Sequence, residues 1–171
     1  MQAIIYTSNT GSTACYADML SQKISLPAYS MEEAKDKVEP GAEVIYLGWL
    51  MASEIKGYKN AVKKYKVRAA CGVGMRPTGT QSEEVRKRSN IAQDIPVFTL
   101  QGNFDIKKLH GVYKMLMKVM VKNVGKVLAE KADRTPEEND MLDMMLNGTE
   151  RVSEENLKDI LDWYKSEVDS I

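Results

Sequence analysis

Short apolar runs alternate with segments of helical character along most of this chain. Four mainly apolar runs have the length and composition of buried strands. They are residues 3–6, 44–47, 67–73 and 96–100. The segments between them that have helical spacing or the charge content of a surface helix are residues 13–24, 58–65 and 82–90. This alternation predicts an α/β fold whose parallel sheet is covered by helices on both faces.

A single doubly wound sheet of about five strands fits 171 residues better than a barrel does. In such sheets, ligands bind at the carboxyl ends of the strands, near the point where the strand order reverses. Three loops leave these ends in the predicted sheet, after Thr7, Gly48 and Leu100. We therefore expect a binding site to be formed by these three loops.

The C-terminal third of the chain is mostly helical. Residues 107–130 form the longest predicted helix, and residues 131–152 read as an added helical segment that starts at Thr135-Pro136. Ser153 is expected to cap a last helix. An earlier capping box, Ser30 with Glu33, predicts a short helix over residues 31–38. The chain is thus expected to be one domain with an insertion at 131–152 before the last helix.

Charge is balanced overall but unevenly distributed. Residues 1–129 hold 19 Lys and Arg against 11 Asp and Glu, a net +8, and residues 130–171 hold 5 against 13, a net −8. We expect the acidic segment to fold back on the basic body. Cys15 and Cys71 form no CxxC pattern, and no basic and apolar leader opens the chain, so a cytoplasmic protein with reduced thiols is expected.

The loop after the first strand is rich in hydroxyl groups and carries no charge. It reads Ser8-Asn9-Thr10-Gly11-Ser12-Thr13 and leads into the first predicted helix. The first turn of a helix has unpaired N–H groups at the positive end of its dipole, so this loop could hold a phosphate without a cation. No GxxxxGK[ST] or GxGxxG pattern is present, which argues against ATP or GTP hydrolysis and dinucleotide binding. The simpler alternative is a cluster of turn and cap residues.

The pattern Ser8-x-Thr10-Gly11-x-Thr13 after an N-terminal strand resembles the phosphate loop of flavodoxin-like FMN proteins. Residues 97–105 are similar to the second flavin loop of the flavodoxin-domain subfamily that includes menaquinone-dependent protoporphyrinogen oxidase. The resemblance implies a flavodoxin-like three-layer sandwich with a five-stranded parallel sheet and an extra C-terminal helical insertion. It also implies FMN as a cofactor.

The resemblance also implies which residues contact the cofactor. The residues expected to bind the FMN phosphate are Ser8, Asn9, Thr10, Gly11, Ser12 and Thr13. The residues expected along the isoalloxazine ring are Trp49, Leu50, Met51 and Ala52 on one side and Gln101, Gly102, Asn103 and Phe104 on the other. The flavin would carry the electrons, so no catalytic side chain is expected. The single histidine, His110, argues against a multi-histidine metal site.

The function implied is electron transfer or a flavin-dependent oxidoreductase activity, with a redox partner protein or a quinone- or porphyrin-type substrate. Protoporphyrinogen oxidase-like, quinone-linked chemistry is one form of it, and no nucleic-acid partner is expected. Electron-carrier flavodoxins are typically strongly acidic, whereas this chain is neutral, and its second flavin loop lacks tyrosine. The alternative is therefore a flavin-free binding module on the same fold.

Two further patterns have both a functional and an ordinary interpretation. Lys114, Lys118, Lys122 and Lys126 recur every four residues in the longest helix. They predict either a sheet-covering helix with a solvated lysine row, which we expect first, or peripheral contact with an anionic membrane. The segment from Cys71 to Arg76 has the spacing of a thiolate loop, CxxGxR. We expect Cys71 instead to be a buried strand residue followed by a turn.

Overall fold

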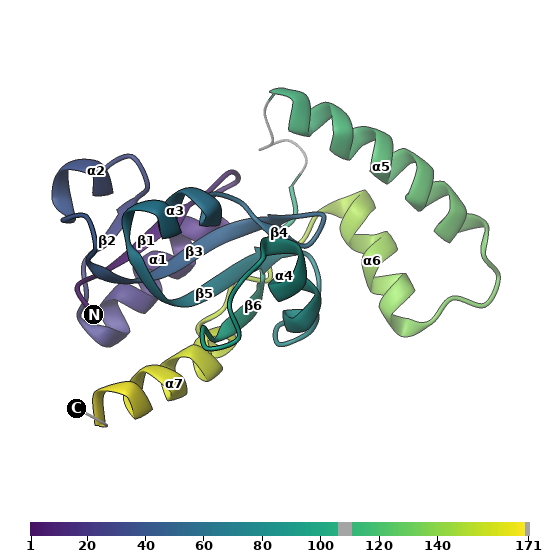
Figure 1. Ribbon diagram of the computed structural model, residues 1–171. Helices are drawn as coiled ribbons and strands as arrows, with labels where there is room; N and C mark the ends of the chain where they lie inside the picture. Colours follow the sequence, from purple (N-terminus) through teal and green to yellow (C-terminus); the bar gives the residue numbers. More distant parts are fainter. Residues whose placement is uncertain (106–110, 170–171) are drawn as a thin grey trace. The chain divides into compact units, whose positions relative to one another are not determined.

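The computed structural model describes residues 1–105 and 111–169, apart from the side chain of Tyr113. The chain divides into two compact units (Figure 1). Unit 1 comprises Met1–Gly102 and Val152–Ile171, and unit 2 comprises Asn103–Arg151. Each unit is described by itself below. The predicted start of the long helix at Lys107 and the single histidine, His110, lie outside the described residues.

Unit 1 is built on a mostly parallel sheet, as the sequence pattern predicts. Its parallel strands are β1 (Ala3–Thr7), β2 (Ala28–Ser30), β3 (Glu43–Met51), β5 (Lys66–Gly74) and β6 (Val97–Gln101). They lie in the order β2-β1-β3-β5-β6 (Figure 1). Counted along the chain, this is the 2-1-3-4-5 order of flavodoxin-like doubly wound sheets, with its switch point between β1 and β3. The α/β fold is confirmed.

Helices of unit 1 cover both faces of the sheet, because successive strand residues point to opposite faces. Ile5 and Tyr46 belong to the cluster under α2 (Ala34–Lys37), α3 (Tyr58–Lys64) and α4 (Ser82–Ser89). Ile4 and Ile45, the neighbouring residues, belong to the cluster under α1 (Ser12–Ile24) and α7 (Lys158–Asp169). A short 3-10 helix, η2 (Glu154–Leu157), precedes α7 and buries Leu157. Burial of both faces explains the continuous apolar runs of the strands.

Two strands of unit 1 were not expected from the sequence. β2 has three half-buried residues and pairs with β1 from Ile4↔Ala28 onward. It is too short to give a periodic pattern. The capping box beside it does form, because the Ser30 N–H donates to the Glu33 carboxylate (2.9 Å) and the Glu33 N–H donates to the Ser30 hydroxyl (3.3 Å). The helix that follows is only α2, shorter than the predicted residues 31–38.

The second unexpected strand, β4, forms a hairpin with the end of β3. β3 continues through Gly48 to Met51 and pairs antiparallel with β4 (Glu54–Ile55). Ala52 and Ser53 form the turn with φ of 50° and 61°. Two central residues with positive φ are typical of the tight hairpin turns that right-twisted strands favour. The expected loop after Gly48 is therefore a strand and a turn, and the pair Ala-Ser lacks the usual Asn-Gly signal.

Unit 2 contains the helices α5 (Gly111–Glu130) and α6 (Pro136–Asn147). α6 starts as predicted, with Thr135 and Glu138 in a capping box and Pro136 in the first turn, and Gly148 follows its end. α5 packs against α6, where Met144 and Met145 are buried. Within unit 2, the helix that α5 contacts is α6. The expectation that the long helix covers the sheet concerns both units and stays a prediction. Unit 2 thus contains α5 as well as residues 131–151.

Candidate functional site

The hydroxyl-rich loop lies where the strand order predicts a site, between the end of β1 and the start of α1. Thr7 ends β1 beside Gly48 of β3, at the switch point of the sheet. Gly11 precedes α1 with φ of +103°, in the region that favours glycine. No side chain of the N-cap residue caps α1. Because Gly11 has no side chain, the first-turn N–H groups of α1 receive no cap from the N-cap residue itself.

The side chains of the loop add polar groups to this helix start. Ser12 and Thr13 are buried in the first turn of α1. The Ser8 hydroxyl accepts a long hydrogen bond from the Ala14 N–H (3.4 Å). The Asn9 side-chain Nδ2 is buried and has no hydrogen-bond partner in the described chain. A buried donor without an acceptor costs about 1–3 kcal/mol, so this loop suits an acceptor-rich group such as a phosphate.

The Tyr46 side chain of β3 links the end of β1, just before this loop, to the segment that precedes α3. Its hydroxyl forms hydrogen bonds with Thr7 Oγ1 (2.7 Å) and with the carbonyl oxygen of Lys56 (2.8 Å). The ring is fully buried and meets Tyr58 edge to face at 6.2 Å between centroids. Burial raises the pKa of Tyr46 from 10 to about 12, since the protein interior disfavours the phenolate. Gly57 lies against the same hydroxyl.

The Tyr46→Phe variant is expected to be less stable at pH 8 by about 1 kcal/mol, because two hydrogen bonds are lost. This deficit is expected to shrink above pH 10. The raised pKa means that the unfolded chain loses the Tyr46 proton first, so the wild type loses stability from about pH 10 toward 12. The loss from Tyr46 is about 1 kcal/mol at pH 11.

Urea unfolding at several pH values measures this difference. Burial also raises the pKa of Tyr16 and Tyr58, and both remain in the variant, so only the difference between the two proteins isolates Tyr46. A deficit that stays constant from pH 8 to pH 11 would contradict the buried, protonated state of Tyr46.

The residues expected along one side of the isoalloxazine ring do not share one surface. Trp49, Leu50 and Met51 are in strand β3, and Ala52 is in the hairpin turn. Leu50 packs over Gly72 and Gly74 of β5, where an added Cβ would lie 2.6 Å and 2.9 Å from its side chain. Because strand residues alternate, Trp49 and Met51 point to the other face from Leu50. Only these two of the three strand residues can face a common ligand.

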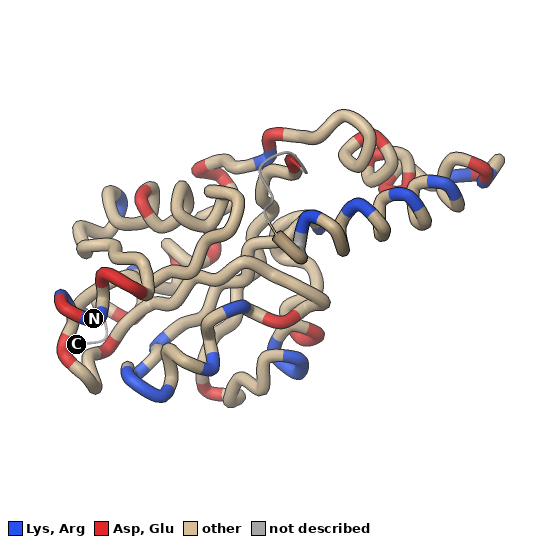
Figure 2. Tube along the Cα trace, turned by 90° about the horizontal axis from the view of Figure 1, so that it is seen from above, with Lys and Arg blue, Asp and Glu red and all other residues tan. Residues whose placement is uncertain are grey.

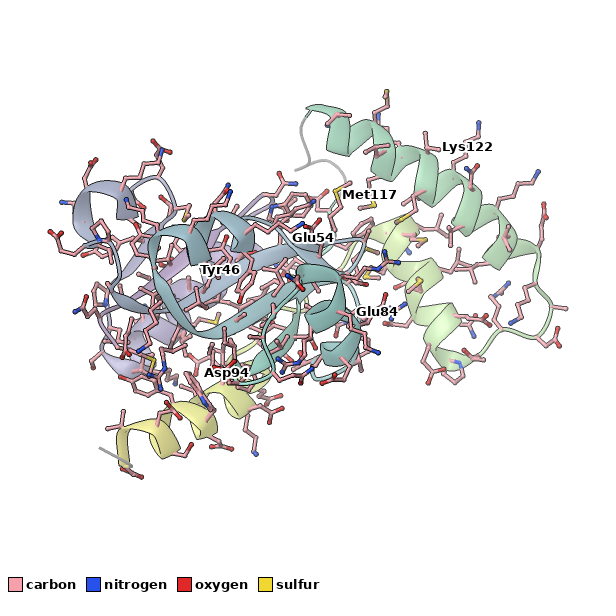
Figure 3. The ribbon with its side chains drawn as sticks, viewed as in Figure 1. Tyr46, Glu54, Glu84, Asp94, Met117 and Lys122 are labelled. Atoms are coloured by element: carbon pink, nitrogen blue, oxygen red, sulfur yellow. The ribbon has the colours of Figure 1, made fainter. Side chains whose placement is uncertain are left out.

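A contact network fixes the hairpin to the loop after β5. Glu84 of α4 accepts hydrogen bonds from the Ser53 hydroxyl (2.7 Å) and from Arg76 (3.4 Å). Figure 3 labels Glu84 on α4 and Glu54 on the hairpin. Glu54 pairs with Lys59 (2.6 Å), and this hydrogen bond holds the pKa of Glu54 below its usual value. The hairpin is therefore held in place on both of its sides.

The third expected loop splits between the two units. Gly102 lies close to the start of α1, since an added Cβ would be 3.2 Å from Ser12 Cβ and 3.0 Å from Val73 Cγ1. The structure thus brings Gly102 and Ser12 together, from loops 90 positions apart. Asn103 and Phe104 belong to unit 2. There Asn103 accepts a hydrogen bond from the Arg151 N–H, and Phe104 is buried and bridged to Thr149 (3.0 Å).

A closed ring of hydrogen bonds holds the backbone of Gln101 at the end of β6. The Gln101 N–H donates to the Thr78 hydroxyl (2.9 Å), and Thr78 donates to Asn156 Oδ1 (2.7 Å). Asn156 Nδ2 donates to the Tyr16 hydroxyl (2.7 Å), which donates to the Gln101 carbonyl oxygen. No local pattern marks this ring, because its members come from four separate segments.

Unit 1 also has a cavity of about 220 Å³ beside the edge strand β6. Its lining includes Thr78, Thr99, Asn156 and Asp159 and does not include the loop from Ser8 to Thr13. The cavity is small for a flavin-sized ligand, since ligand pockets usually measure about 300–1,000 Å³. It is thus separate from the candidate phosphate loop.

Cys71 is a buried residue inside β5, as expected. Burial raises the pKa of its thiol far above the usual value. A thiolate is the reactive form of cysteine, so Cys71 cannot serve as the nucleophile that the CxxGxR spacing would require.

Comparison with models of known protein families, with curated proteins and with solved structures finds no match for this chain. Among the described helices, none combines the length and the apolar character needed to cross a bilayer. The assignment of a function therefore depends on the residues of the candidate site.

Proposed function

We propose that this chain binds FMN noncovalently and serves as a redox protein. The observation that carries the proposal is the buried Asn9 Nδ2, which has no hydrogen-bond partner in the described chain and lies in the loop before α1, at the β1/β3 switch point. A site of neutral donors at a helix start suits a phosphate dianion. The doubly wound sheet supports the proposal, since FMN in this fold binds at that switch point.

The residues of unit 1 would divide the binding of FMN between them. Backbone N–H groups and hydroxyls of Ser8–Thr13 would hold the phosphate, and Gly11 would let the backbone approach it closely. Trp49 and Met51 offer apolar surface at the carboxyl end of β3, and the backbone at Gly102 borders Ser12. The residues from Ser8 to Thr13 would suit the phosphate end of the cofactor.

Bound FMN would supply one- or two-electron redox chemistry. The protein would act as an electron carrier or as an FMN-dependent oxidoreductase, with a redox partner protein or a quinone- or porphyrin-type substrate. No described side chain is assigned a catalytic role. Cys15 and Cys71 are both free thiols, which suits the reducing conditions of the cytoplasm, where we place the protein.

An absorbance spectrum tests the proposal. The purified protein is mixed with FMN, desalted and scanned, and bound flavin is expected at about one equivalent per chain. A protein that retains no flavin at micromolar concentration would refute the redox function. The fold would then serve a flavin-free binding module, with the loop from Ser8 to Thr13 available to another anion.

A further inference from the structure

Helix α5 of unit 2 has one face packed and one face exposed. Leu128 and Gly125 are buried, and Met117, Met120 and Val121 are half-buried. This face packs against α6, which buries Met144 and Met145. The packed face accounts for the helix pairing within unit 2.

A second apolar face of α5 remains exposed. Its members are Val112, Met115, Leu116, Val119 and Val127, with exposed fractions of 58%, 63%, 47%, 54% and 67%. At 3.6 residues per turn, these positions fall on one side of the helix. The exposed Asn123 lies between Val119 and Val127, so the first four of these residues form the contiguous apolar patch, and such patches mark interaction sites.

Lysines run along one edge of this exposed face. Lys118, Lys122 and Lys126 recur every four residues, and all three are exposed. Figure 2 shows basic residues repeated along the length of α5. Residues 111–130 hold four lysines and a single acidic residue, Glu130, at the end of the helix. The exposed face is therefore apolar, with a basic border.

We propose that this face of α5 binds to the surface of an anionic membrane. A helix with an apolar face and lysines at its border lies in the headgroup region, where the apolar side chains enter the lipid and the lysines meet anionic headgroups. Pairing of α5 with a second copy of the chain would place two lysine rows around one interface. Repulsion between the two lysine rows would oppose this pairing, whereas an anionic membrane attracts the lysines.

Cosedimentation with lipid vesicles tests this proposal on the full chain. We expect binding to vesicles of equimolar phosphatidylglycerol and phosphatidylcholine at about 0.05 M salt, and little binding to phosphatidylcholine alone. Binding is expected to fall in about 1 M salt, where the Debye length is about 3 Å. Absence of binding to the anionic vesicles at low salt would overturn the proposal.

Two variants and a control identify the face. Val119→Asp is expected to weaken vesicle binding at least about tenfold, since it puts a charge into the apolar face. The double variant Lys118→Gln/Lys122→Gln is expected to weaken it roughly 30-fold. Val168→Asp changes a valine of α7 that is 50% exposed, close to the 54% of Val119, and should bind like the wild type.

Circular dichroism establishes that each variant is folded. Equal losses in Val119→Asp and Val168→Asp would overturn the proposal, as would unchanged binding of the double lysine variant. A wild-type dimer that Val119→Asp dissociates, with vesicle binding unchanged, would overturn it in favour of a second copy as the occupant of this face.

Discussion

Replacing Gly57 with alanine is expected to lower the free energy of unfolding of unit 1 by about 3–4 kcal/mol. Gly57 has φ of +85°, and its added Cβ would lie 2.1 Å from the Tyr46 hydroxyl and 2.5 Å from Thr7 Oγ1. The methyl group would displace the hydroxyl that joins β1, β3 and the start of α3. The variant therefore tests the contact that holds the base of the candidate phosphate loop.

Gly41→Ala is the matched control for Gly57→Ala. Gly41 has a nearly equal φ of +83°, but nothing lies within 4 Å of its added Cβ. Only the backbone strain remains, so the free energy of unfolding is expected to fall by about 1 kcal/mol. Urea unfolding followed by tryptophan fluorescence measures both, because Trp49 and Trp163 are both in unit 1. Equal losses in the two variants would show that Tyr46 is not packed against Gly57.

The Thr10→Val variant is expected to raise the Kd for FMN about 10- to 100-fold. A hydrogen bond to a charged group contributes about 1.5–3 kcal/mol, and valine keeps the shape of threonine without the hydroxyl. Thr10 is half-buried in the loop before α1, so the substitution should leave the fold intact. Quenching of flavin fluorescence during titration measures the Kd.

Two controls separate loss of the phosphate contact from general damage. Riboflavin lacks the phosphate, so its Kd should be the same for Thr10→Val and the wild type. Thr80→Val changes an exposed threonine in the loop after β5, where the hydroxyl donates to the Pro77 carbonyl (2.7 Å), and should leave the Kd for FMN unchanged. If Thr10→Val weakened riboflavin and FMN equally, the hydroxyl would not serve the phosphate.

The fold was largely predictable because its signals are local. Both faces of the sheet are buried, so strands such as β1 and β3 read as continuous apolar runs. β2 was missed because its three half-buried residues depend on pairing with β1 rather than on their own pattern. The hairpin after Gly48 was missed because Ala52 and Ser53 adopt positive φ without the residue types that usually favour it.

The candidate site was predictable only in part. The loop from Ser8 to Thr13 could be found because its composition and its place after a strand are both local. The approach of Gly102 to Ser12 and the bond between Tyr46 and Thr7 join distant segments and depend on strand order and packing. The opposite directions of Leu50 and Trp49 follow from a strand that the sequence suggested was a loop.

The affinity of the wild-type protein for FMN relative to riboflavin tests the central claim most directly. The two ligands share the isoalloxazine ring and differ in the phosphate that the loop from Ser8 to Thr13 would hold. FMN is expected to bind at least about a hundredfold more tightly, since several charge-assisted hydrogen bonds depend on the phosphate. Equal affinities, or no binding of either flavin, would contradict a phosphate site at the start of α1.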